Sequence, residues 1–112
     1  MEARREVAAA LADWDHPTEA EFAVLLTSEV VTNAVVHAGP HVSGNKLRLV
    51  LEQTDELVRI EVTDWRTALP LAGDGAVDKL GGRGLLLLDA LATQWGVIPF
   101  DSGKVVWFEL SA

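Results

Sequence analysis

Apolar residues recur at helical spacing at the start of the chain. Within residues 2–14, Val7, Leu11 and Trp14 stand three or four positions apart, with alanines of high helix propensity between them. This pattern predicts a first helix. The helix should end at the Asp-His-Pro sequence, because the residue before Pro17 is pushed out of the helical region.

A second and longer helical pattern follows. Thr18 and Glu21 form a capping box, so we expect this helix to run from about Glu19 to Ala38. The Gly-Pro pair after Ala38 is a usual stop signal, and a turn follows it. Apolar residues occupy two sides of this helix, which predicts that it lies between other elements.

The rest of the chain changes to strand periodicity, interrupted once. Apolar and polar residues alternate over 46–53 and 57–64, and a short turn joins these segments, which predicts a β-hairpin. Two final strands are predicted at 95–100 and 104–110, with an Asp-Ser-Gly turn between them.

Between these hairpins lie a loop and a third helix. Residues 65–81 show neither helical nor strand periodicity, which predicts a loop, and loops of this length are often lids. Residues 81–94 begin with glycines and continue apolar, which predicts a helix. The order is therefore helix, helix, strand, strand, loop, helix, strand, strand. It predicts an α/β (α+β) two-layer sandwich, with about four mainly antiparallel strands and three helices on one face, as a single domain over 1–112.

Composition narrows the classes of function. The 112 residues are 49% apolar, enough for a real core, and they carry 17 acidic against 9 basic residues for a net charge of −8. This balance argues against binding to a phosphate backbone, so no direct nucleic-acid contact is expected. There is no cysteine, which excludes disulfides and thiolate metal sites. Every apolar run is far shorter than the roughly 20 residues that a membrane span needs, so we expect a soluble, cytoplasmic protein.

Three polar residues interrupt the apolar pattern of the second helix. Glu29, Asn33 and His37 are spaced four apart and form one stripe, which Phe22 and Leu26 continue toward the start of the helix. Burying a carboxylate and an amide without partners costs on the order of several kcal/mol. The stripe therefore predicts a pocket in which oxygen ligands help to hold a divalent cation, with Mg²⁺ the best suited.

Two further features predict binding chemistry. Asp64 ends a strand just before the long loop, where a carboxylate can accept a hydrogen bond from an exocyclic amine, although it could also cap a turn. Residues 81–84, Gly-Gly-Arg-Gly, begin a helix whose exposed N–H groups form a ready anion site, and Arg83 adds a cation. Trp65 at the root of the loop either packs in the fold or stacks on a ligand.

In combination these residues resemble a family. The segment SEVVTNAVVHA resembles the N box of the GHKL ATPases, in the version found in bacterial anti-sigma-factor serine kinases and related small actinobacterial ATP-binding regulators. The opening ARREVAAALADW, the VTD ending at Asp64, the GGRGLLLLDALA segment and the closing WGV and GKVVWFEL segments extend this resemblance over nearly the whole chain.

The resemblance implies the Bergerat fold, with ATP and Mg²⁺ between the helix layer and a lid. Glu29 matches the general base, Asn33 the Mg²⁺ ligand and Asp64 the carboxylate that binds adenine. His37 matches a position common in the small kinases, near the phosphates or the lid. The turn that holds the phosphates matches Gly82, Arg83, Gly84 and Leu85.

The resemblance also implies partners. The expected function is an ATP- and Mg²⁺-binding regulatory domain that binds a sigma factor and phosphorylates Ser or Thr of an anti-sigma-factor antagonist protein, with a homodimer as a further expectation. An alternative is a protein-binding module that has lost nucleotide turnover. Two departures favour it: Asp64 is followed by Trp-Arg-Thr-Ala instead of Asp-x-Gly-x-Gly, and Val105 replaces a threonine frequent near the adenine. A third possibility is an ATP-hydrolysing switch without a protein substrate.

Overall fold

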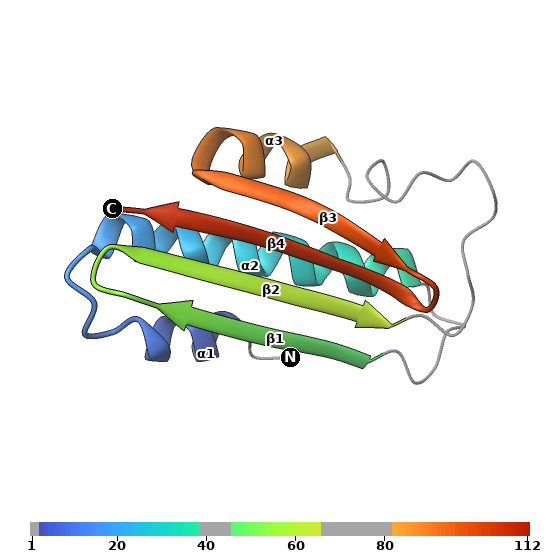
Figure 1. Ribbon diagram of the computed structural model, residues 1–112, viewed down its shortest axis with the longest axis horizontal. Helices are drawn as coiled ribbons and strands as arrows, with labels where there is room; N and C mark the ends of the chain where they lie inside the picture. Colours follow the sequence, from blue (N-terminus) through green and yellow to red (C-terminus); the bar gives the residue numbers. More distant parts are fainter. Residues whose placement is uncertain (1–2, 39–45, 66–81) are drawn as a thin grey trace.

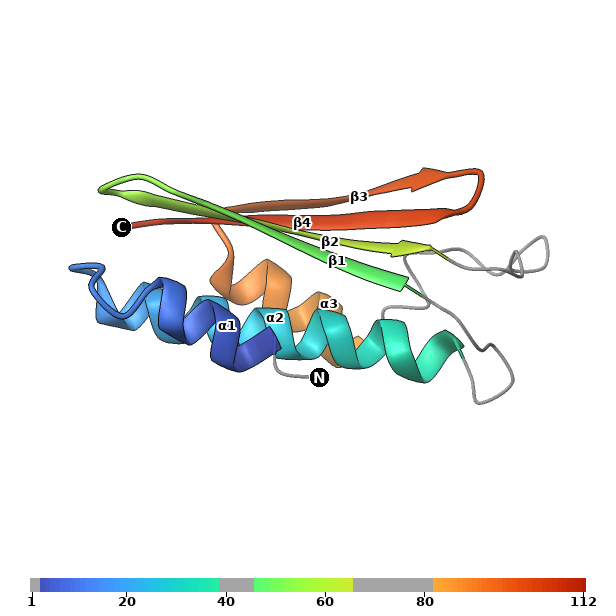
Figure 2. The same ribbon diagram turned by 90° about the horizontal axis from the view of Figure 1, so that it is seen from below.

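The protein folds into two layers, a sheet and a set of helices on one of its faces (Figures 1 and 2). The computed structural model describes residues 3–38, 46–65 and 82–112. In chain order the elements are α1 (Ala3–Ala10), α2 (Pro17–Ala38), β1 (Lys46–Gln53), β2 (Leu57–Trp65), α3 (Gly82–Leu91), β3 (Gln94–Phe100) and β4 (Gly103–Ser111). The predicted fold class is confirmed. No helix in these described ranges is long and apolar enough to cross a membrane.

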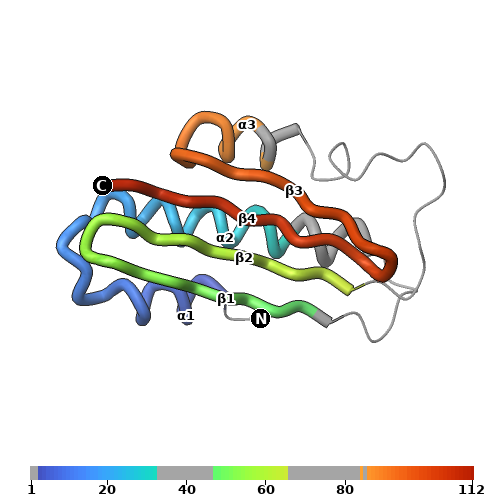
Figure 3. The backbone as a smooth tube through the Cα atoms, viewed as in Figure 1, coloured from blue at the N-terminus to red at the C-terminus, as the bar shows by residue number. Residues whose placement is uncertain are grey.

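The sheet has four strands in the order β1-β2-β4-β3, and every neighbouring pair is antiparallel. Figure 3 traces how β4 enters between β2 and β3. In this register Asp64 of β2 lies opposite Lys104 of β4 on one side and opposite Leu47 of β1 on the other. The end of β2 therefore meets the start of β4 at one end of the sheet.

The core lies between the inner face of the sheet and the helices. Every second residue of β2 and β4 is buried, as the alternation of apolar residues predicts. Helix α2 lies in the middle of the helix layer, and α1 and α3 flank it (Figures 1 and 2). The largest fully buried apolar side chains come from α1, α2, α3 and the two central strands: Val7, Leu26, Leu88, Val58, Ile60, Val62, Val106, Phe108 and Leu110.

Helix α1 is shorter than the periodicity predicts. It ends at Ala10, yet Leu11 and Trp14 are still buried. The indole N–H of Trp14 donates to the carbonyl oxygens of Thr54 at 3.0 Å and Asp55 at 3.2 Å. Trp14 therefore anchors the α1–α2 connection to the β1–β2 turn, and its spacing reflects this contact and not a continuing helix.

The start of α2 also differs from the expectation. The helix begins at Pro17, one residue before the predicted cap Thr18. The carbonyl oxygen of His16 accepts the first helical hydrogen bond, from the Ala20 N–H at 2.9 Å. Proline fits the first helical position because it has no N–H to leave unpaired and its φ angle already suits a helix.

The outer face of the sheet carries a polar and aromatic cluster. The Arg59 guanidinium donates to Glu61 at 3.1 Å and to Glu109 at 2.9 Å, and it lies 4.4 Å from the ring centroid of Trp107. Partial burial alone would lower the pKa of Arg59, but the hydrogen bonds to Glu109 and Glu61 outweigh it and raise the pKa above its ordinary value. The ring of Trp107 covers Gly96, where an added Cβ would come within 2.8 Å of the indole nitrogen.

Candidate functional site

The predicted site residues come from three elements that meet at one end of the molecule. The C-terminal half of α2, the first turn of α3 and the end of β2 all lie toward this end (Figures 1 and 2). Helix α2 packs against both α3 and β2. Residues distant in sequence are thus brought to the same end of the molecule.

The polar stripe of α2 lies on a continuous helix, as predicted. Glu29, Asn33 and His37 all fall within Pro17–Ala38, so their spacing of four residues places them on one face. Glu29 is half-buried, and Leu26, just under one turn earlier, is fully buried. The side chains of Asn33 and His37 lie outside the described part of the structure, so their predicted roles stay predictions.

Asp64 is a buried carboxylate on the inner face of the sheet. It continues the row of buried β2 residues and is 1% exposed. Its Oδ2 atom forms an ion pair with Nζ of Lys104 at 3.7 Å, and Lys104 is only 5% exposed. Ionised groups are costly to bury even as pairs, and buried titratable groups gather at functional sites. The position of Asp64 therefore suits the predicted contact with an exocyclic amine.

The residues that follow Asp64 and Lys104 point the other way. Neighbouring residues on a strand face opposite sides of a sheet, so Trp65 and Val105 lie on the outer face. Trp65 packs edge-on against Phe100, with ring centroids 6.4 Å apart. The structure thus places Trp65 away from Asp64 and favours its packing role over ligand stacking. The inference drawn from Val105 was wrong, because its side chain is not on the face that carries Asp64.

Lys104 is the residue that sequence reasoning missed. A signal was available, because Lys104 has the same strand parity as Val106, Phe108 and Leu110 and therefore had to share their buried face. The sequence does not reveal the register of β4 against β2. Only this register shows that the neighbour of Lys104 is Asp64.

The predicted anion site falls on the first turn of α3. The helix begins at Gly82, and Gly84 is buried. The first N–H groups of a helix have no acceptor within it and favour negative charge, so this turn fits phosphate groups. The side chains of Arg83 and Leu85 lie outside the described residues, as does the predicted lid within 65–81, which is described only at Trp65.

The donor set also fits a magnesium nucleotide. Within the described ranges no three His, Cys, Asp or Glu side chains gather as a metal cluster. Mg²⁺ bound with a nucleotide usually takes one or two protein oxygens and completes its shell with phosphate oxygens and water. A buried carboxylate, a helix N-terminus and the oxygen ligands expected on α2 match the amine, phosphate and metal parts of such a ligand.

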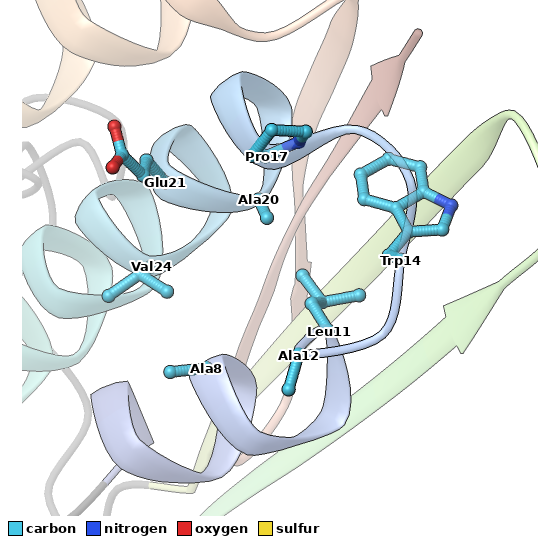
Figure 4. Close-up of a pocket in the computed structure, with 8 residues that line it drawn as sticks. All are labelled: Ala8, Leu11, Ala12, Trp14, Pro17, Ala20, Glu21 and Val24. Atoms are coloured by element: carbon cyan, nitrogen blue, oxygen red, sulfur yellow. The ribbon is translucent and has the colours of Figure 1, made fainter.

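A separate groove of about 350 Å³ lies between α1 and α2 (Figure 4). Helices α1 and α3 flank α2 on opposite sides, so this groove is not at the predicted site (Figure 1). Its lining is mainly small and apolar, and its one charged residue is Glu21, which does not suit phosphate. The lining residues are Ala8, Leu11, Ala12, Trp14, Pro17, Ala20, Glu21 and Val24.

Comparison with known proteins shows the family to which the chain belongs. A sequence profile described as "Histidine kinase-like ATPase domain" matches residues 1–110, nearly the whole chain. The chain belongs to this family. The resemblance to the GHKL ATPases is therefore confirmed, and the family is one of nucleotide-binding, kinase-type domains that bind ATP, typically with Mg²⁺. A search of curated proteins found no match.

Two solved structures of a histidine kinase share the fold. The histidine kinase domain from the Erythrobacter litoralis EL346 blue-light activated histidine kinase is 24% identical, with a TM-score of 0.63, and the match covers 83% of this chain and 44% of that one. A second structure of the Erythrobacter litoralis EL346 kinase is 26% identical, with a TM-score of 0.62, over 84% of this chain and 30% of that one. The chain thus spans less than half the length of these proteins.

Proposed function

We propose that this chain binds ATP with Mg²⁺ and acts as a regulator of the anti-sigma-factor kind, in the cytoplasm. It binds a sigma factor and transfers phosphate to a Ser or Thr of an antagonist protein. The observation that carries the nucleotide part of the proposal is the buried Asp64 at the end of β2, beside the helix layer that bears the polar stripe. A hydrogen bond from the amino group of a base would explain why a carboxylate is buried in this largely apolar face.

The predicted roles divide the nucleotide among the three elements. Asp64 accepts a hydrogen bond from the adenine amino group, and the first turn of α3 at Gly82 and Gly84 holds the phosphates. Asn33 on α2 provides an oxygen to Mg²⁺. The metal ion, when bound, neutralises charge on the phosphates.

In the transfer reaction Glu29 takes the proton of the acceptor hydroxyl. The hydroxyl oxygen forms a bond to the γ-phosphorus while the bond from that phosphorus to the bridging oxygen breaks, so that ADP leaves. Positioning and charge neutralisation account for most of the acceleration in phosphoryl transfer. A half-buried carboxylate on a rigid helix suits the positioning part of this task.

Isothermal titration calorimetry with ATP and Mg²⁺ tests nucleotide binding. The proposal predicts saturable heat that Asp64→Asn weakens, since an amide cannot replace a carboxylate as an acceptor-only group. No heat at millimolar nucleotide, with a folded protein shown by circular dichroism, would contradict it.

Incubation with labelled ATP and candidate antagonist proteins tests transfer. The proposal predicts transfer that Glu29→Gln abolishes while ATP binding remains. Glu21→Gln is a matched control, because Glu21 is an exposed carboxylate on the same helix that lines the groove on the α1 side. Equal loss in both variants would contradict the assignment of Glu29.

The alternative of a nucleotide-degenerate module rests on one sequence feature. Trp65 and the residues after it replace the glycines that usually follow the adenine-binding aspartate in this family. The same two experiments decide the matter when measurements of sigma-factor binding and of phosphate release are added to them. Binding of a sigma factor without ATP binding and without label transfer would establish the module, whereas steady phosphate release without a protein acceptor would indicate a hydrolytic switch.

A further inference from the structure

Two charged residues interrupt an otherwise apolar inner face of the sheet. One transverse row across the four strands consists of Leu49, Val62, Val106 and Val97, and the next row of Leu51, Ile60, Phe108 and Trp95. The row at the site end reads Leu47, Asp64, Lys104 and Pro99. Its two central positions thus hold one carboxylate and one ammonium group, both almost completely buried.

Core stability alone does not explain this pair. Apolar residues of similar volume are often as good as a buried ion pair, or better, because removing two charges from water is costly. Apolar residues fill the neighbouring rows. A buried ion pair at the end of the sheet nearest the polar stripe of α2 therefore indicates a ligand that needs both charged groups.

The two groups together present an acceptor beside a donor. The distance from Nζ to Oδ2 is 3.7 Å, longer than the roughly 2.7–2.9 Å of a charge-assisted hydrogen bond. An ammonium group has three N–H donors and a carboxylate has about four acceptor positions, so each can serve its partner and a ligand together. Adenine presents the complementary edge, because its amino donor stands directly beside a ring-nitrogen acceptor, N1 or N7.

We propose that Lys104 is a base-recognition residue that donates a hydrogen bond to the ring nitrogen of adenine beside the amino group accepted by Asp64. This inference rests on the proposed binding of ATP. Hydrogen bonds made where water is largely excluded are stronger than in bulk water, so the lysine contributes both affinity and selectivity. It also fixes which edge of the base faces the sheet.

The first test uses the wild-type chain and needs no variant. Calorimetry compares ATP with 1-deaza-ATP and 7-deaza-ATP, in which N1 or N7 is replaced by a C–H group. One analogue should bind roughly 10-fold or more weakly than ATP, as expected for the loss of a hydrogen bond to a charged donor. If both analogues bind as tightly as ATP, Lys104 does not read the base and the inference is overturned.

The second test assigns this discrimination to Lys104. Lys104→Met should lose it, so that ATP and the weaker analogue bind alike, while ATP itself binds about 10-fold more weakly than to wild type. Arg48→Met is the matched control, since Arg48 is an exposed cation on β1 and the charge change is the same. Discrimination retained by Lys104→Met overturns the inference while ATP binding still supports the proposed function. Absence of ATP binding to the wild-type chain overturns both.

Discussion

The buried ion pair makes a quantitative prediction about stability in the absence of nucleotide. Replacing Asp64 by Val leaves the Lys104 ammonium in a site where 7% of its side chain is exposed. Replacing Lys104 by Met leaves the Asp64 carboxylate, with 2% exposed, in the same position. Each single change removes the opposite charge without restoring contact with water.

The expected cost of either change is large. Breaking a buried pair by removing one partner typically costs about 3–5 kcal/mol, because an uncompensated charge stays buried. Domains of this size have a free energy of unfolding of roughly 5–15 kcal/mol, so each change removes a substantial share. At roughly 2–8 °C per kcal/mol for domains of this size range, the midpoint of thermal unfolding should fall by about 10 °C or more.

The double replacement should behave differently. Asp64→Val with Lys104→Met removes both charges and continues the apolar rows that precede this one. Replacing a whole buried pair by apolar residues is often neutral or stabilising by about 1–4 kcal/mol. The free energy of unfolding of the double variant should therefore lie near or above that of the wild type, while nucleotide binding is lost.

Urea denaturation of wild type, the Asp64→Val and Lys104→Met single variants and the double variant measures the coupling. The matched control is the pair of Arg59 and Glu109 on the outer face, which is shorter, at 2.9 Å, but has side chains 27% and 22% exposed. Its coupling should be about 1 kcal/mol or less, as for other exposed pairs. Additive costs at Asp64 and Lys104, or a larger coupling at the exposed pair, would refute the reasoning.

Three further predictions concern other parts of the fold. Thr27 is fully buried and its hydroxyl has no hydrogen-bond partner among the described residues, so Thr27→Val should raise the free energy of unfolding by about 1 kcal/mol in urea; a decrease would contradict this. Gly103→Ala should lower the free energy of unfolding by roughly 1–3 kcal/mol and weaken ATP binding, because the added Cβ would collide with the carbonyl oxygen of Asp64. A hydrogen-exchange rate at the end of β2 equal to that of the wild type would contradict this prediction. The pKa of Arg59 is raised above its ordinary value, so from pH 7 to about pH 10 the guanidinium stays charged in both the folded and the unfolded chain. The difference in unfolding free energy between wild type and Arg59→Met should therefore stay constant over this range.

The sequence predicted the architecture well because the periodicities were strong. Alternation in 46–53 and 57–64 reports which residues face the core, and the structure has strands over these ranges. Helix ends were less accurate, since contacts with distant parts of the chain help to decide them. Trp14 is buried through hydrogen bonds to the β1–β2 turn, and no local pattern shows that contact.

The candidate site was predictable only in part, for a similar reason. The stripe of Glu29, Asn33 and His37 follows from helical spacing alone. The pairing of Asp64 with Lys104 depends on strand register between segments 40 residues apart, which local propensity does not encode. The inference from Val105 was wrong by one residue, because Lys104 faces the helix layer and Val105 lies on the opposite face of β4.

The most direct test of the whole account is a crystal structure with a non-hydrolysable ATP analogue and Mg²⁺. We expect the adenine amino nitrogen to lie about 3 Å from a carboxylate oxygen of Asp64, with the phosphates at the first turn of α3. A nucleotide bound in the groove between α1 and α2, or bound with its base remote from Asp64, would contradict the account.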